Sequence, residues 1–305
     1  MKVLILGSSG LVGSSLNRVL GNSHKISEIF PATRKEADLF SLEETQSLIK
    51  DISPDVVINA AAKVGGIYAN DTFRTEFILD NLKINMNLIE ACKENEKIKI
   101  INLGSSCIYP LDAQNPILEE SLMTGKLEPT NSPYAIAKIA GIEMGRALSK
   151  QYGNLVLNLM PTNLYGPNDN FSEKESHVIP GLIKRMHDAK NANTKEFKVW
   201  GTGNPLREFL FVDDLASSIN FLIDRNVDFD LLNVGSGLEI SIKDLAYKIK
   251  DTVGFKGKIV FDENMPDGNP RKLIDSGKIN DLGWVPKITL DEGLVLTYEW
   301  FVKNY

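Results

Sequence analysis

A hydroxyl, a thiol, a phenol and an ammonium group occur at spacings that suit acid and base chemistry on a carbonyl carbon. Ser105 and Cys107 follow an apolar run that ends at Leu103, and Tyr134 and Lys138 stand four residues apart in a helical pattern. Residues at i and i+4 share one helix face, so the cation can lie beside the phenol and lower its pKa from ~10. The pattern predicts proton transfer during reduction of a carbonyl or oxidation of a carbinol.

A glycine-rich turn near the start of the chain supports a catalytic role for this Tyr–Lys pair. The support is needed because such pairs also occur by chance on amphipathic helices. The turn follows an apolar run, opens a helical pattern, and consists of Gly7, Ser8, Ser9, Gly10, Leu11, Val12 and Gly13. Its glycines let the backbone turn tightly and approach a pyrophosphate, which the N-terminus of the next helix attracts. A turn that binds nothing is the alternative, and the strand–turn–helix context disfavours it.

The end of the second expected strand favours NADP over NAD. An NAD enzyme usually has Asp or Glu there to bind the adenosine ribose, but this chain has no acid before Glu36. Arg34, alone or with Lys35, could instead hold a 2′-phosphate in a charge-assisted pair. Five further residues are expected to line the cofactor: Asp38, Leu39, Ala60, Ala61 and Ala62.

Short apolar runs alternate with amphipathic helical patterns along the first half of the chain. Strands are expected at 3–6, 26–30, 56–59, 99–103 and 155–160, and helices near 11–20, 41–52, 77–95 and 133–151. This alternation is typical of βαβ units that build a parallel sheet with helices on both faces. The sequence therefore predicts an α/β fold, a Rossmann-type doubly wound parallel sheet.

After Pro161 the pattern changes to connections rich in Pro, Gly and Asn. Shorter strands are expected at 197–200 and 232–234, and helices near 176–190, 213–224 and 241–252. We expect residues 1–165 to form an NADP-binding Rossmann domain, which a strand near 231–235 joins. Residues 166–305 would form a smaller C-terminal α/β domain that binds the substrate.

Composition narrows the class of protein. The 305 residues are 43% hydrophobic and 24% charged, as in ordinary globular enzymes, and the net charge of −6 argues against a nucleic-acid partner. No stretch approaches the length of a membrane span. Cys92 and Cys107 are too few for a disulfide framework, which favours the cytoplasm. His24, His177 and His187 show no metal-ligand spacing with the cysteines, so no metal is expected.

Segments along most of the chain carry a resemblance to a known family. They are 60–67 (AAAKVGGI), 103–110 (LGSSCIYP), 127–131 (LEPTN), 134–138 (YAIAK), 160–167 (MPTNLYGP), 176–180 (SHVIP), 200–201 (WG), 207–209 (REF) and 266–268 (PDG). With these segments the chain resembles the GDP-L-fucose synthase family of extended short-chain dehydrogenases/reductases, which are GDP-4-keto-6-deoxymannose epimerase/reductases. The resemblance implies NADPH as reductant and a GDP-linked keto sugar as substrate.

The resemblance also implies roles for individual residues. Ser105, Tyr134 and Lys138 would form the reductase triad, and Cys107 and His177 would be the base and the acid of epimerisation. A C4 ketone acidifies the protons on C3 and C5, and a thiol of pKa ~8.5 and an imidazole of pKa ~6.5 can be tuned to move them. The alternatives are that Cys107 is a small buried hydrophobe and that His177 caps a helix.

Further contacts follow from the same resemblance. Cofactor contacts are implied for Lys138, Pro161, Asn163, Leu164 and His177. Substrate contacts are implied for Ser106, Cys107, Asn163, Arg185, Trp200, Arg207 and Asp267, and the arginines suit the diphosphate. The family commonly dimerises through helices that correspond to 77–95 and 133–151, so we expect a homodimer.

One residue departs from the family pattern. Members often have a basic residue inside the glycine loop that also touches the 2′-phosphate, but this chain has Ser9. The expected preference for NADP therefore depends mainly on Arg34.

Four other functions compete with this interpretation. A 4,6-dehydratase would need a Thr-Asp-Glu run where this chain has Ser106, Cys107 and Ile108. A simple C4 epimerase that recycles its NAD usually has a small inert residue at the position of Cys107. A catalytically silent NADP-sensing module should have lost Tyr134 or Lys138. A GDP-4-keto-heptose C4 reductase with little or no epimerase activity remains as the alternative.

Overall fold

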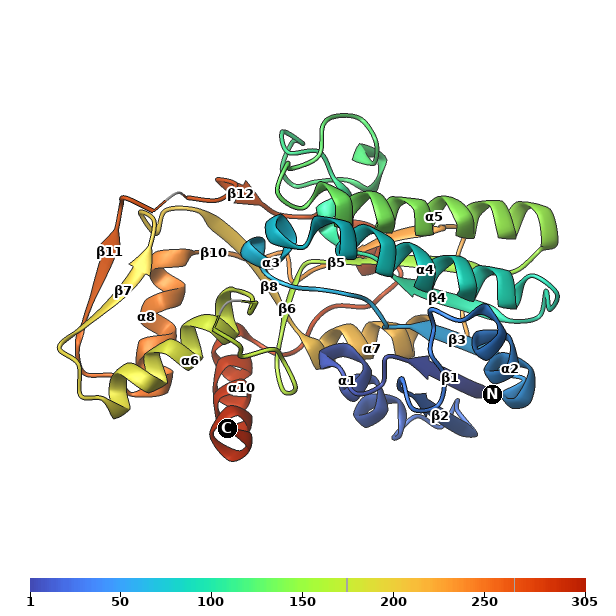
Figure 1. Cartoon of the computed structure of the whole chain (residues 1–305), viewed down its shortest axis with the longest axis horizontal. Coiled ribbons are helices and arrows are strands. Elements are labelled where there is room, and N and C mark those ends of the chain that lie inside the picture. Colours follow the sequence, from blue (N-terminus) through green and yellow to red (C-terminus); the bar gives the residue numbers. More distant parts are fainter. Residues whose placement is uncertain (174, 266) are drawn as a thin grey trace.

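Six parallel strands form the central sheet of the protein, which a computed structural model describes for residues 1–173, 175–265 and 267–305 (Figure 1). The strands are β1 (Lys2–Leu6), β2 (Glu28–Ala32), β3 (Val56–Asn59), β4 (Lys99–Leu103), β5 (Val156–Pro161) and β9 (Leu231–Val234). Their order in space is β2-β1-β3-β4-β5-β9, and every neighbouring pair is parallel. The order reverses direction at β1, which is the doubly wound arrangement that the sequence predicts.

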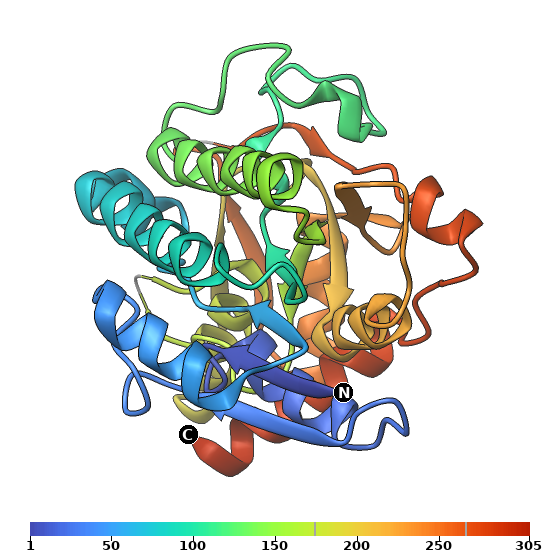
Figure 2. The same cartoon turned by 90° about the vertical axis from the view of Figure 1, so that its right-hand side faces the viewer.

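Helices cover both faces of this sheet because its strands are apolar on both sides. The helices are α1 (Leu11–Leu20), α2 (Leu42–Ile52), α4 (Arg74–Cys92), α5 (Ser132–Tyr152) and α7 (Val212–Leu222). Along β1, Val3 and Ile5 pack in the core that contains α1 and α7, whereas Leu4 and Leu6 pack in the core that contains α2, α4 and α5. Figure 2 shows α4 and α5 side by side on one face of the sheet. This alternation is the period of two that a strand imposes.

The second half builds a smaller α/β unit beside the carboxyl ends of the strands (Figure 1, left). Its elements are β6 (Asn163–Tyr165), α6 (Val178–Asn191), β7 (Glu196–Trp200), β8 (Leu206–Phe211), β10 (Glu239–Ser241), α8 (Ile242–Val253), β11 (Lys258–Asp262), β12 (Arg271–Lys272) and α10 (Leu290–Asn304). The short helix α9 (Gly277–Asp281) instead packs against β9 of the large sheet. Aromatic and aliphatic side chains from α6, β7, β8, α8 and α10 form a core of their own. Short elements in the first half are α3 (Ile67–Thr72), η1 (Ser106–Ile108) and η2 (Glu119–Ser121).

The chain returns to the large sheet after β8. Strand β9 pairs with β5, and α7 packs against α1, where Asp213 accepts hydrogen bonds from Ser15 and Arg18 at 2.5 Å each. The return therefore includes the helix α7 as well as the strand near 231–235.

Most expected elements match the observed ones within two or three residues. The strands expected at 56–59 and 99–103 coincide with β3 and β4, and the helix expected near 133–151 is α5. The second strand lies two residues later than expected because Pro31 takes part in it. Proline is tolerated there because β2 lies at the edge of the sheet and, among the described strands, has β1 as its single neighbour.

A ladder of buried asparagines crosses three neighbouring strands. Asn59, Asn102 and Asn158 are in register on β3, β4 and β5, and each of the first two donates through Nδ2 to Oδ1 of the next, at 3.0 and 3.1 Å. Asn59 Nδ2 also donates to Asn85 on α4, and Asn85 Nδ2 donates to the carbonyl of Ala137 on α5. Because every partner is polar and buried, the ladder fixes strand register and the position of α5 over the sheet.

Replacing Asn102 by Ala is expected to lower the free energy of unfolding by about 2–4 kcal/mol, because it leaves Asn158 Oδ1 buried without a partner and removes one of the two hydrogen bonds of Asn59 Nδ2. Asn304→Ala, at the exposed end of α10, serves as the control and should stay within ~0.5 kcal/mol. Urea denaturation measures both. A loss for Asn102→Ala no larger than that of the control would contradict the ladder's role.

Neither a membrane-spanning helix nor a cluster of metal ligands is found among the described residues. None of the helices in the described ranges combines the length and the apolar character that a bilayer crossing needs. Within the same ranges, no group of three or more His, Cys, Asp or Glu side chains converges as metal ligands would.

Candidate active site

Helix α5 places Tyr134 and Lys138 on its inner face, near the carboxyl end of β4. The side chains are almost completely buried, with exposed fractions of 9% and 3%. Lys138 Nζ lies 5.7 Å from the centre of the Tyr134 ring and donates a hydrogen bond to the carbonyl of Leu103 at 2.9 Å. The carbonyl at the end of β4 therefore anchors the ammonium group beside the phenol.

Burial dominates the electrostatics of this pair. It raises the pKa of Tyr134 above its ordinary value, with a further increase from Cys107 and a smaller opposing effect from a hydrogen bond with Ser105. Burial also lowers the pKa of Lys138 to about 8. The expectation that Lys138 lowers the pKa of Tyr134 is thus not met in this arrangement. A phenol that stays protonated at neutral pH is suited to donating a proton.

The turn after β4 brings a hydroxyl and a thiol to the same place. Ser105 Oγ accepts a hydrogen bond from the N–H of Cys107 at 3.2 Å, which starts the short helix η1. Cys107 is half-buried and packs against the cluster that Ala69, Phe77 and Tyr134 form. The structure therefore brings Ser105, Cys107 and Tyr134 together, and the thiol keeps accessible surface that a fully buried hydrophobe would lack.

Asn131 is a candidate functional residue that the sequence analysis missed. It stands at the N-cap position of α5 but makes no capping hydrogen bond. Instead its Nδ2 donates to Cys107 Sγ at 3.6 Å, and its Oδ1 is buried with no hydrogen-bond partner. Asparagine directly before a helix normally signals a cap, so no local pattern indicates a contact with the thiol.

A close backbone approach ties the segment before His177 to the loop after β3. The N–H of Gly66 donates to the carbonyl of Glu175 at 2.9 Å, and a Cβ on Gly66 would lie 2.6 Å from the carbonyl oxygen of Ser176. Only glycine fits this contact. It joins the start of α6, where His177 is the N-cap residue, to the loop in which Lys63 also lies.

His177 does not behave as a simple helix cap. Its side chain makes no capping hydrogen bond with α6. The ring keeps accessible surface, yet protein surrounds it closely enough that desolvation lowers its pKa. A cavity of about 330 Å³ lies next to this segment, between the residues after β3, the aromatic side chains of Phe73 and Phe77, and Glu175. The His177 side chain is therefore not committed to capping α6, and Glu175, two residues before it, lines the cavity.

The glycine turn after β1 has the shape that a dinucleotide pyrophosphate needs. Gly7 has a φ of +74°, and a Cβ there would lie 2.7 Å from Cα of Ala61. A Cβ on Gly13 would lie 2.2 Å from the carbonyl oxygen of Gly7, so a side chain fits at neither position. A Cβ on Gly10 would meet the carbonyl oxygen of Gly7 at 3.6 Å, an ordinary contact. The N-cap of α1 has no capping side chain, so the first N–H groups of the helix remain available to a ligand.

The end of β2 offers a cation and no free carboxylate. Arg34 is exposed just after the strand. Glu36 is the first acid, and its carboxylate accepts hydrogen bonds from the N–H and the hydroxyl of Thr33, both at 2.7 Å. These hydrogen bonds hold the pKa of Glu36 below its usual value. The carboxylate is therefore engaged in a local turn. The contact expected between Arg34 and a 2′-phosphate stays a prediction.

An arginine and a tryptophan lie together at the outer end of the second unit. The Arg185 guanidinium is 5.3 Å from the Trp200 ring and 5.1 Å from the Phe197 ring, and it donates to the carbonyl of Lys198 at 2.6 Å. Burial lowers the pKa of Arg185. Trp200 is 61% exposed, so the indole keeps a free surface against which a planar group could stack.

Asp267 is tied to the turn between β7 and β8. Its two carboxylate oxygens accept hydrogen bonds from the N–H of Thr202 at 2.9 Å and from the hydroxyl of Thr202 at 2.6 Å. Pro266, the first residue of the motif at 266–268, lies outside the described residues. Arg207 is half-buried, and desolvation lowers its pKa while the charge of Asp267 opposes that change. The Asp267 carboxylate is therefore fixed by Thr202 at a position close enough to Arg207 to affect its pKa.

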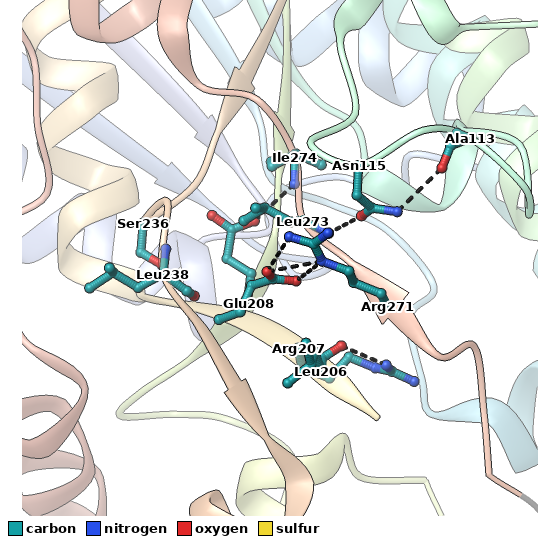
Figure 3. Close-up of polar contacts among 11 residues, drawn as sticks. Ala113, Asn115, Leu206, Arg207, Glu208, Ser236, Leu238, Arg271, Leu273 and Ile274 are labelled. Atoms are coloured by element: carbon teal, nitrogen blue, oxygen red, sulfur yellow. Dashed lines mark hydrogen bonds and ion pairs between the residues drawn. The ribbon is translucent and has the colours of Figure 1, made fainter. Parts of the chain in front are cut away.

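Glu208 fixes the strand that carries Arg207 (Figure 3). Its carboxylate is fully buried and accepts hydrogen bonds from the N–H of Gly237 at 2.8 Å and of Ile274 at 3.2 Å. Its carbonyl accepts from Asn163 Nδ2 at 2.8 Å. Burial raises the pKa of Glu208, and these N–H donors oppose the increase. The strand β8 thus holds Arg207 and Asn163 in a fixed relation.

Three further residues for which substrate or cofactor contacts are expected differ in their exposure to solvent. Ser106 is buried within η1, Pro161 is buried at the end of β5, and Leu164 is half-buried in β6. The contacts expected for them with substrate and cofactor stay predictions.

Comparison of the sequence with family models and with known proteins identifies the family of this chain. A model of the NAD dependent epimerase/dehydratase family matches residues 3–235. The chain is also 51% identical over 304 residues to a protein of Oryza sativa subsp. japonica named "Probable GDP-L-fucose synthase 1", an alignment that covers 99% of this chain and 92% of the relative. This chain belongs to the GDP-L-fucose synthase family.

Solved structures of similar proteins have the same fold. A GDP-L-fucose synthetase from Naegleria fowleri bound to NADP has a TM-score of 0.92 and 30% identity, covering 100% of this chain and 93% of that one. A GDP-6-OMe-4-keto-L-xylo-heptose reductase from C. jejuni has a TM-score of 0.91 and 32% identity, covering 100% and 98%. The expected α/β Rossmann-type fold of the GDP-L-fucose synthase family is confirmed.

Proposed function

We propose that this protein is an NADPH-dependent epimerase/reductase that converts GDP-4-keto-6-deoxymannose into GDP-L-fucose, by epimerisation at C3 and C5 and then reduction at C4. The observation that carries this proposal is the packing of Cys107 against Tyr134 in one cluster, beside Ser105. A thiol for carbon acids and a phenol for the ketone oxygen are thus available to one bound sugar. Membership of the GDP-L-fucose synthase family supports the choice of substrate.

In the reduction, Tyr134 donates its proton to the C4 oxygen as the ketone becomes an alcohol. NADPH, when bound along the glycine turn, supplies the hydride. Ser105 holds the same oxygen by a hydrogen bond, and Lys138, anchored by the carbonyl of Leu103, places its charge beside the phenol. The raised pKa of Tyr134 keeps the proton in place until the oxygen gains negative charge.

In the epimerisation, Cys107 removes the protons that the C4 ketone acidifies, and His177 returns protons from the opposite face. Asn131 assists by donating a hydrogen bond to Cys107 Sγ, which helps to hold the sulfur in position. The lowered pKa of His177 makes its protonated form a stronger acid, which suits delivery of a proton to an enolate carbon. The two chemical steps thus use different residues around one bound ketone.

Reduction of a GDP-4-keto-heptose at C4, with little or no epimerisation, is the second candidate. The likeness to the heptose reductase from C. jejuni favours it, but the identity is 32%, against 51% to the rice relative. In that case Cys107 and His177 would position the sugar instead of moving protons.

Location and assembly belong to the same proposal. We infer a cytoplasmic homodimer that works without a nucleic-acid or membrane partner and pairs through α4 and α5. Exposed apolar side chains on these two helices support the pairing, among them Leu79, Met86 and Ile136. Association would remove their apolar surface from water.

Replacing Arg34 by Ala should weaken NADPH binding by about 10- to 100-fold, because it removes a charge-assisted contact with the 2′-phosphate. NADH lacks that phosphate and should lose little. Fluorescence titration of both cofactors with both proteins measures the difference. An equal loss for NADPH and NADH would contradict the role of Arg34.

The proposed activity can be tested on the purified protein with substrate and cofactor. NADPH should be oxidised when GDP-4-keto-6-deoxymannose is added, with GDP-L-fucose as product, and should stay reduced with GDP-mannose, which has no ketone. Failure to oxidise NADPH with the keto sugar would contradict the proposal. Faster oxidation with a GDP-4-keto-heptose would favour the second candidate.

A further inference from the structure

A loop at the end of β2 is fastened to helix α4. Asn87 Nδ2 donates to the carbonyl of Leu39 at 2.8 Å, which joins the loop to α4. Asp38 Oδ1 accepts from the N–H of Phe40 at 3.0 Å and so shapes the turn. The Phe40 ring remains 37% exposed. The loop therefore presents an aromatic surface beside the position expected for the adenosine of the cofactor.

Two cations approach the ring of Phe40 from different elements. The Arg34 guanidinium lies 5.9 Å from the ring centre, and Lys83 Nζ, from α4, lies 5.3 Å from it. Lys83 stands four residues before Asn87, so both share the helix face that meets the loop. Arg34 follows the strand β2 and Lys83 lies on the helix α4. Both cations therefore lie close to the same ring, that of Phe40.

Neither cation has an ion-pair partner among the described residues. In the part of the chain that the structure describes, no carboxylate lies within 4.0 Å of either Arg34 or Lys83, whereas many other basic side chains have an ion-pair partner. Glu36, the nearest acid in sequence, is bonded to Thr33. Two unpaired cations against one ring match a phosphate monoester, which carries about −1.5 to −2 charge at pH 7.

The glycine turn gives no charge to this region, because its central position is Ser9. We propose that Lys83 binds the 2′-phosphate of NADPH together with Arg34 and supplies the second positive charge that Ser9 cannot. This inference rests on the proposed use of NADPH. It assigns the cofactor preference to a residue of α4, more than forty residues after Arg34.

The test uses 2′,5′-ADP and 5′-AMP as probes, since they differ only by the 2′-phosphate. Lys83→Met should weaken 2′,5′-ADP binding by about 5- to 20-fold in calorimetric titration and change 5′-AMP binding by less than about 2-fold. Lys50→Met is the matched control, because Lys50 is an exposed cation near the carboxyl end of α2 with no contact to Phe40 and no expected part in the site. The control should change 2′,5′-ADP binding by less than about 2-fold.

A second substitution separates loss of charge from damage to the helix. Ser9→Arg, added to Lys83→Met, should restore 2′,5′-ADP binding to within about 3-fold of the original protein, because it returns a cation to the same phosphate. Equal weakening of 5′-AMP and 2′,5′-ADP by Lys83→Met would overturn the inference, as would no weakening at all. If the unaltered protein bound both probes equally, the NADPH assignment itself would fail, and the assignment of Lys83 with it.

Discussion

Tyr134→Phe is expected to lower C4 reduction by about 10²- to 10⁴-fold, the usual effect of removing a general acid. The substitution deletes only the hydroxyl, while the ring that packs against Phe77 and Cys107 stays in place. NADPH affinity and the midpoint of thermal unfolding should therefore hardly change. Single-turnover oxidation of NADPH with the keto sugar measures the reduction step.

Tyr152→Phe is the matched control for this experiment. Tyr152 ends the same helix, α5, but is exposed and far along the helix from Tyr134. Its substitution should leave the reduction rate unchanged. A Tyr134→Phe protein with near-normal turnover would mean that another group gives the proton to the C4 oxygen.

Cys107→Ser is expected to reduce deuterium uptake from solvent at C3 and C5 by about 10²-fold or more, because an alcohol is a far weaker base than a thiolate. Reduction of a keto sugar that already has the final configuration should continue, since Tyr134, Lys138 and Ser105 are unaltered. Mass spectrometry of the product counts the deuterium atoms. His177→Asn should likewise impair the return of protons more than it impairs hydride transfer.

Cys92→Ala gives the matched control for the thiol. Cys92 is fully buried on α4, and burial raises its pKa to about 12, so it is an inert thiol. Its loss should alter stability but not deuterium uptake per folded molecule. Normal uptake by the Cys107→Ser protein would assign the base to another residue.

Much of the fold and the reactive groups could be predicted because they depend on short-range patterns. The glycine turn, the spacing of Tyr134 and Lys138, and the apolar runs of β3 and β4 are all visible within a few residues. The helix α10 was also predictable in principle. Thr289 and Glu292 form a capping box at its start, a signal that the sequence analysis did not use.

Other features depend on contacts between distant segments. The asparagine ladder needs strand register, which no local pattern supplies, and Asn131 meets Cys107 only after α5 is docked. The pKa of Tyr134 illustrates the same limit. Spacing alone predicts that Lys138 lowers it, whereas the folded protein buries both groups and raises it. Burial is a property of the whole fold, so sequence spacing cannot reveal which electrostatic effect is larger.

The most direct test of the proposed function is the reaction of the unaltered protein with GDP-4-keto-6-deoxymannose and NADPH in deuterated water. We expect GDP-L-fucose that carries solvent deuterium at both C3 and C5, and hydrogen from the cofactor at C4. A product reduced at C4 without deuterium at C3 and C5 would contradict the epimerase assignment.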